Sequence, residues 1–136
     1  MKDPRQALGK VAEALRPLHK SLIDVTVVAY EKEHGRIGGP NALFQLLVHD
    51  PYFAWLRPMS GLMAELDEAL DEPKAGEEAR PIDGGHFRNL IEHLITEGGD
   101  DFSRRYLQIL QAEPDVVMAH AALRRALSDV PGKLSH

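Results

Sequence analysis

The sequence lacks cysteine altogether, and only eight of its 136 residues are aromatic (one Trp, three Tyr and four Phe). Without cysteine the chain can form no disulfide, no thiolate metal site and no cysteine nucleophile. The opening residues, MKDPRQALGK, contain no apolar stretch of the kind found in signal peptides. The longest apolar run, near VTVVAY, is far shorter than the ~20 residues of a membrane-spanning helix. We therefore expect a cytoplasmic protein with no membrane segment.

An excess of positive charge is also absent, because 16 basic residues face 21 acidic ones and the formal net charge is −5. The acidity is local. Residues 65–80 (ELDEALDEPKAGEEAR) contain seven acidic and two basic residues, which leaves 14 of each kind for the rest of the chain. No stretch forms the basic stripe that binding of nucleic-acid phosphates requires. We therefore expect no nucleic-acid partner.

Apolar residues recur at helical spacing almost throughout, and no stretch shows the alternation typical of a β-strand. A chain of this length is long enough for one domain with one hydrophobic core. The sequence therefore predicts an all-α fold, in which residues 1–136 form a single domain like a four-helix bundle with additional short helices. The acidic segment 71–85, which contains proline and glycine, is predicted to be a long connecting loop.

Three predicted helices follow an acidic residue and a proline, at Asp3, Asp50 and Glu113. Proline suits the first turn because its missing N–H would be unpaired there, and aspartate caps the turn better than glutamate. The predicted helices span residues 4–34, 40–49, 51–70, 86–97, 101–112 and 114–128. We expect Pro58 to interrupt the third helix, because the residue before a proline, here Arg57, is steered away from helical geometry.

The first predicted helix carries an apolar seam in alternating steps of three and four residues: Leu8, Val11, Leu15, Leu18, Leu22, Val25 and Ala29. This spacing is typical of helices whose side chains interlock with those of a neighbouring helix. Pro17 lies off the seam and is predicted to bend or split the helix. The second half of the helix is apolar on most sides, through Ile23, Val27, Val28 and Tyr30. We therefore expect it to be buried, either centrally or by a partner subunit.

The segment HDPYFAWLRPMS, residues 49–60, concentrates three aromatic residues within four positions. These rings cannot all point the same way on a helix, since neighbouring residues lie 100° apart. The segment could plug the core, contact a partner or line a pocket for a small ligand. Aromatic, arginine and methionine side chains are common in protein interfaces. The candidate interface residues are Tyr52, Phe53, Trp55, Arg57, Met59 and Met63.

The sequence contains no glycine-rich phosphate loop, no GxSxG motif and no HExxH motif. Histidine and carboxylate side chains on helices are the remaining candidates for chemistry, because such groups bind metals in bundle cores. The candidate ligands are Glu31, His34, His86, His93, Glu97 and His120. Together they could bind iron, manganese or zinc. Each also has a structural explanation, as a helix-end residue, a polar flank or a core histidine, and in that case no cofactor is expected.

Three longer segments resemble a known group of proteins: LHKSLIDVTVVAYEKEHG, LLVHDPYFAWLRPMSGLMAELDE and PDVVMAHAALRRAL. They are similar to a family of short, uncharacterised bacterial proteins that carry an Asp-Pro-x-Phe-Ala-Trp-Leu-Arg-Pro segment. The resemblance covers most of the chain, and DPYFAWLRP is its most specific part. It implies a small, all-helical cytoplasmic protein of bacteria, and it implies no activity.

Two functional hypotheses follow from these patterns. The first is a helical-bundle interaction protein that forms a homodimer through the second half of helix 4–34 and the aromatic segment, with a further protein partner possible. The alternative is a bundle that binds a metal or a small ligand, which could be an enzyme, through the histidine and carboxylate side chains named above.

Overall fold

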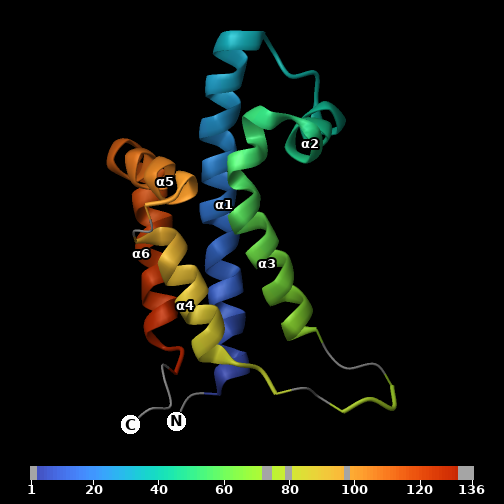
Figure 1. Cartoon of the computed structure of the whole chain (residues 1–136), viewed down its shortest axis with the longest axis vertical. Coiled ribbons are helices and arrows are strands. Elements are labelled where there is room, and N and C mark those ends of the chain that lie inside the picture. Colours follow the sequence, from blue (N-terminus) through green and yellow to red (C-terminus); the bar gives the residue numbers. More distant parts are fainter. Residues whose placement is uncertain (1–2, 72–74, 79–80, 97–98, 132–136) are drawn as a thin grey trace.

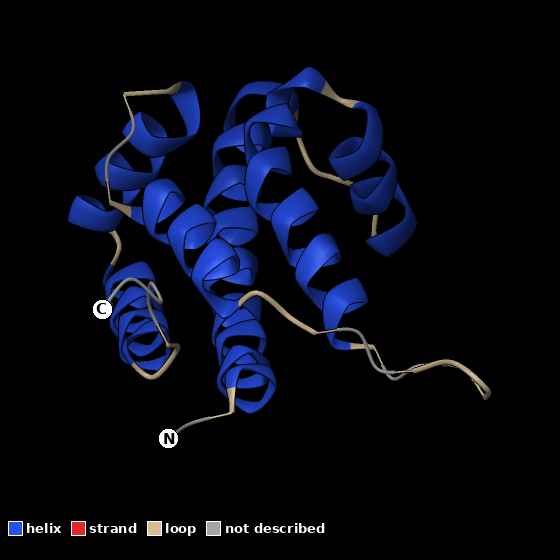
Figure 2. Cartoon of the chain, turned by 60° about the horizontal axis from the view of Figure 1, so that its bottom comes forward, coloured by secondary structure: helices blue, strands red, loops and turns tan. Residues whose placement is uncertain are grey.

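The computed structural model describes residues 3–71, 75–78, 81–96 and 99–131. These residues form six α-helices and one 3-10 helix, and the described part of the chain contains no strand. The elements are α1 (Pro4–His34), α2 (Pro40–His49), the 3-10 helix η1 (Pro51–Leu56), α3 (Arg57–Leu70), α4 (Gly84–Ile95), α5 (Asp101–Ala112) and α6 (Pro114–Ser128). The prediction of an all-α fold is therefore confirmed (Figure 2).

The long helix α1 is the centre of the fold, and the other main helices pack along it. Figure 1 shows α3 on one side of α1, with α4 and α6 on the other and α5 above α4. The arrangement of α1, α3, α4 and α6 around one core is compatible with the predicted four-helix bundle. The short helix α2 lies outside this group, beside the upper end of α3, and its main packing partner is η1. No helix of the described residues combines the length and the hydrophobicity needed to cross a membrane.

The apolar seam of α1 is buried over its first five positions, from Leu8 to Leu22, as predicted. Beyond Leu22 the prediction is wrong, because Val25 is only half-buried and Ala29 is exposed. Thr26 is buried in their place, and its hydroxyl donates a hydrogen bond of 2.7 Å to the carbonyl oxygen of Leu22. An α-helix has 3.6 residues per turn, so a seven-residue repeat drifts by about 20° per heptad and the buried face leaves the seam.

Pro17 and Pro58, the two prolines inside predicted helices, affect the backbone differently. α1 runs without interruption through Pro17, which is exposed, so the helix is not split there. At Pro58 the chain does change, from the 3-10 geometry of η1 to the α-helix α3. The expected departure of Arg57 from helical geometry is wrong, because its φ of −60° and ψ of −35° are helical. Pro58 instead lies in the first turn of α3, where its missing N–H removes no hydrogen bond.

The helix starts follow the predicted capping chemistry. The side chain of Asp3 accepts a hydrogen bond of 3.1 Å from the backbone N–H of Arg5, and that of Asp50 accepts one of 2.8 Å from Tyr52. Glu113 makes no such side-chain bond, in agreement with the weaker capping by glutamate. The start predicted for α4 at residue 86 is wrong by two residues, because Asp83 caps the helix through the N–H of His86.

Candidate functional site

The aromatic segment contributes three of the predicted interface residues to the protein core. Phe53, Trp55 and Met59 are 1%, 8% and 0% exposed. The remaining three members of the predicted set lie nearer the surface: Tyr52 and Met63 are half-buried, and Arg57 is exposed. The guanidinium of Arg57 donates a hydrogen bond of 2.8 Å to the carbonyl oxygen of Val48, which ties α2 to the start of α3. The structure therefore leaves only part of this segment free to contact a partner.

Trp55 connects η1 to α5 and, through a chain of rings, to α6. Its ring centroid lies 5.5 Å from that of Phe102, and Phe102 stacks on Tyr106 at 5.9 Å. The guanidinium carbon of Arg105 lies 5.5 Å from the centroid of the Trp55 ring. These contacts explain why the tryptophan is buried even though the segment around it lies at the edge of the bundle.

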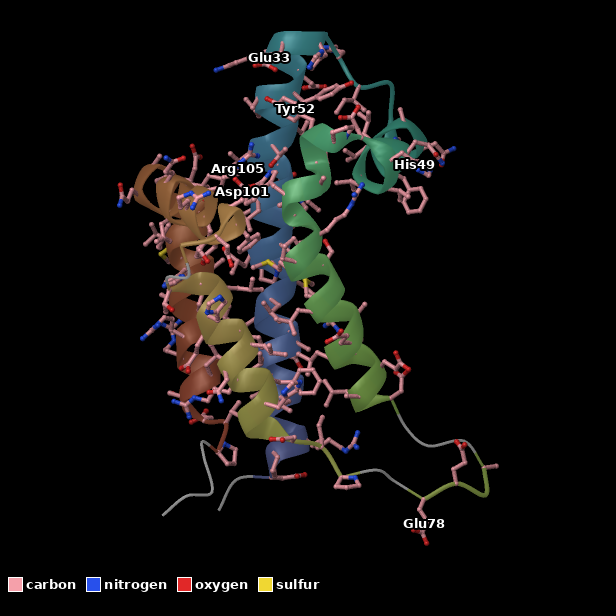
Figure 3. All side chains as sticks on the ribbon, in the orientation of Figure 1. Glu33, His49, Tyr52, Glu78, Asp101 and Arg105 are labelled. Carbon is pink, nitrogen blue, oxygen red and sulfur yellow. The ribbon has the colours of Figure 1, made fainter. Side chains whose placement is uncertain are left out.

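A second group of rings attaches η1 to the end of α1. The ring of Tyr30 lies 5.3 Å from that of Tyr52 and 5.5 Å from that of Phe53. The imidazole of His34 packs on Tyr30 at 4.7 Å between centroids. Tyr52 therefore faces α1, as Figure 3 shows, rather than the outer surface of α2. This ring cluster fixes the position of η1, and with it the position of α2.

The outward face of α2 is the main exposed apolar feature near this segment. Phe44 is 59% exposed and Val48 is 44% exposed, and no residue of α2 is buried. The two side chains are four residues apart and so lie on one side of the helix, while Leu43, Leu46 and Leu47 pack against the core. We call the stripe formed by Asn41, Phe44, Gln45 and Val48 the α2 face.

The α2 face could not be identified by hydrophobicity alone, because a short apolar helix has the same pattern whether it lies in a core or on a surface. The composition of the helix did contain one indication of a special role. α2 is the most hydrophobic of the six α-helices, and the only one without an aspartate, glutamate, lysine or arginine. Phe44 is also the only one of the eight aromatic residues that is exposed.

The predicted metal ligands lie at different ends of the molecule. Glu31 and His34 are in the last turn of α1, and the Glu31 carboxylate accepts a hydrogen bond of 2.9 Å from the N–H of Ile37. His86 is exposed at the start of α4, near the opposite end of the bundle (Figure 1). His93 lies on α4 with its Nε2 3.6 Å from a carboxylate oxygen of Asp100. Across residues 3–71, 75–78, 81–96 and 99–131 no three such side chains gather as a metal site would require, and Glu97 lies outside these ranges.

His120, the remaining metal candidate, is paired with a buried tyrosine. Its Nδ1 lies 2.6 Å from the hydroxyl oxygen of Tyr106, which is completely buried. Burial lowers the pKa of His120, with a further contribution from the charge of Arg124, and burial raises the pKa of Tyr106 well above its ordinary value. The imidazole is therefore neutral at pH 7, and a neutral imidazole has one ring nitrogen that can accept the hydrogen bond that the buried hydroxyl donates. This pair links α5 to α6.

A groove lies between α1 and the junction of α5 with α6. Its cavity has a volume of about 210 Å³. The lining residues come from one face of α1 and from the first turn of α6, and they are Ser21, Asp24, Val25, Val28, Glu113, Asp115 and Val116. We call this feature the α1–α6 groove. It brings together three valines and three carboxylates that the sequence separates by some 85 positions.

The sequence matches no protein-family model, and no curated protein or solved structure is significantly similar to it.

Proposed function

We propose that the protein is a helical-bundle interaction module that associates with a second copy of itself through the α2 face. The observation that carries this proposal is the exposure of Phe44, which is 59% exposed on a helix without an aspartate, glutamate, lysine or arginine. Exposed phenylalanine costs free energy in water, and its burial in a contact is worth up to roughly 1.5–3 kcal/mol. An apolar surface helix with no buried residue is therefore a candidate for contact with another molecule.

A second copy is the partner that the composition of the α2 face fits. Around a two-fold axis each residue of the contact meets the same surface of the other subunit. A stripe of Asn41, Phe44, Gln45 and Val48 can meet itself without like-charge repulsion, because all four side chains are uncharged. The acidic loop around Glu78 lies at the far end of the molecule from α2, so its charge does not oppose this contact (Figure 3).

The expected dimer is weak. α2 has ten residues, and a helix of that length extends about 15 Å. It supplies only part of the roughly 800 Å² per partner that stable interfaces bury, so we expect a Kd in the micromolar range or above. The lack of cysteine suits the reducing cytoplasm, where we propose that this association takes place.

Sedimentation equilibrium of the wild-type protein and of Phe44→Ser tests the proposal. We expect the wild type to dimerise as its concentration rises towards several hundred micromolar, and Phe44→Ser to raise Kd by about tenfold or more. Met118→Ser is the matched control, because Met118 is 72% exposed on α6, away from α2. Its dimerisation should equal that of the wild type. A wild-type protein that stays monomeric over this range, or an equal effect of the two substitutions, would show that the α2 face is not the contact.

A further inference from the structure

The size of the α1–α6 groove indicates what it can bind. Cofactors and drug-sized ligands occupy pockets of about 300–1,000 Å³, whereas this cavity has about 210 Å³. It is therefore suited to one or two side chains of a docked segment rather than to a whole cofactor. Val25, Val28 and Val116 give it an apolar floor, and Val28 is 55% exposed.

The groove exists because the two helices differ in length. α1 continues to His34, whereas α6 begins at Pro114, beside the part of α1 that carries Asp24, Val25 and Val28. Ser21, Asp24, Val25 and Val28 follow one another at steps of three, one and three residues, so they form one continuous face of α1. This face spans about two turns of α1 and forms one wall of the groove.

The charged side chains of the groove are all acidic. Glu113 does not cap α6 with its side chain, and among the described residues neither the Glu113 nor the Asp115 carboxylate makes a hydrogen bond or an ion pair. The helix dipole accounts for Asp115 in the first turn of α6. Asp24 pairs with Lys20 at 3.0 Å, but both side chains are largely exposed, and such pairs contribute little and exchange readily.

We propose that the α1–α6 groove docks a basic amphipathic segment of another protein. One apolar side chain of that segment would lie against Val25 and Val28, above the buried Val116, and flanking lysine or arginine side chains would pair with the carboxylates of Asp24, Glu113 and Asp115. The composition of the groove selects this partner: its apolar floor favours an aliphatic side chain, and the charged residues that line it are all acidic, although Asp24 also has Lys20 beside it. The proposal does not depend on the α2 face.

A titration with a helical leucine–lysine peptide of about 15 residues, followed by backbone amide shifts of ¹⁵N-labelled protein, tests this site. We expect the shifts to centre on residues 21–28 and 113–116. The variant Asp24→Asn/Glu113→Gln/Asp115→Asn should weaken binding by about tenfold or more at about 150 mM salt. Val28→Ser, at a position that is already exposed, should weaken it several-fold.

The matched control removes the same three charges elsewhere, through Glu65→Gln/Asp71→Asn/Glu78→Gln, all at exposed positions in or beside the acidic loop. This variant should bind the peptide within about twofold of the wild type. Equal weakening by both triple variants, shifts that centre on the loop, or equal binding of a serine–lysine peptide would each overturn the proposal. So would loss of self-association in the groove variant, because a second copy would then be the occupant. Phe44→Ser should bind the peptide normally, which separates this test from that of the α2 face.

Discussion

The hydrogen bond between Tyr106 and His120 allows a quantitative test of how α5 is held against α6. Tyr106→Phe removes only the hydroxyl, whose oxygen lies 2.6 Å from His120 Nδ1, and keeps the ring that stacks on Phe102. His120 is half-buried, so water can replace the lost partner. The loss is then that of one hydrogen bond in net terms, and we expect the free energy of unfolding to fall by about 1 kcal/mol.

Removing the other partner, the imidazole of His120, should lower the free energy of unfolding by more. His120→Ala removes the partner of the Tyr106 hydroxyl, which is 0% exposed in the wild type, and a buried hydroxyl without a partner costs roughly 1–3 kcal/mol in addition to the lost packing of the imidazole. In the double variant the hydroxyl is absent as well, so its unfavourable burial disappears. We therefore expect the two effects to be less than additive, with a coupling of about 1 kcal/mol or more.

Urea denaturation of the wild type, the two single variants and the double variant measures this cycle. The denaturant slope must stay constant for the comparison to hold. Additive effects would refute the reasoning, as would a Tyr106→Phe variant that is less stable than His120→Ala. Either result would mean that the hydroxyl does not depend on the imidazole for its hydrogen bond.

Two further predictions concern pH and glycine. Burial lowers the pKa of both His19 and His120 below the ordinary value of 6.5, so the unfolded chain takes up protons first on acidification. The free energy of unfolding should therefore be steady above pH 7 and fall as the pH drops below 6.5, until both histidines are protonated in the folded protein too. A denaturation midpoint that rises from pH 7 to pH 5 would contradict this. Gly9→Ala and Gly61→Ala, where an added Cβ meets no atom within 4 Å, should each raise stability by about 0.5–1 kcal/mol. Gly84→Ala should lower the stability, because the added Cβ would lie 3.2 Å from the Val130 side chain. Val130 is held in place, since its carbonyl oxygen accepts a hydrogen bond of 2.7 Å from the guanidinium of Arg88. Equal gains in thermal midpoint at all three glycines would contradict the packing argument.

Helix positions could be predicted from the sequence because helix starts and apolar spacing depend on residues that are close together in the chain. The bounds of α2 and α6 match the prediction at both ends. The start of each could be predicted because a proline marks the first turn. Which residues of α1 are buried beyond Leu22 could not be predicted from local sequence. Whether Val25 or Thr26 is buried depends on how the helix drifts against its neighbours, and the sequence spacing favoured Val25.

The contacts of individual side chains were less predictable than the helices. His120 was a candidate ligand because it lies on an apolar seam, but its actual partner comes from α5, fourteen residues away. Trp55 and Phe44 are both aromatic residues near the same turn, and only the three-dimensional arrangement places one in the core and the other on the surface. The neighbours of a side chain are set by packing between helices, which no short window of sequence contains.

α2 is the element in which local sequence and tertiary position disagree most. A ten-residue helix is too short to be stable alone in water, so packing must stabilise it. Its packing comes mainly from η1 and from the bond between Arg57 and the Val48 carbonyl, and it leaves Phe44 and Val48 exposed. Sequences usually agree with their fold at every level, and the exceptions concentrate at functional sites. The exposed apolar face of α2 is such an exception, and association through that face would remove the disagreement by burying the residues that the monomer leaves in water.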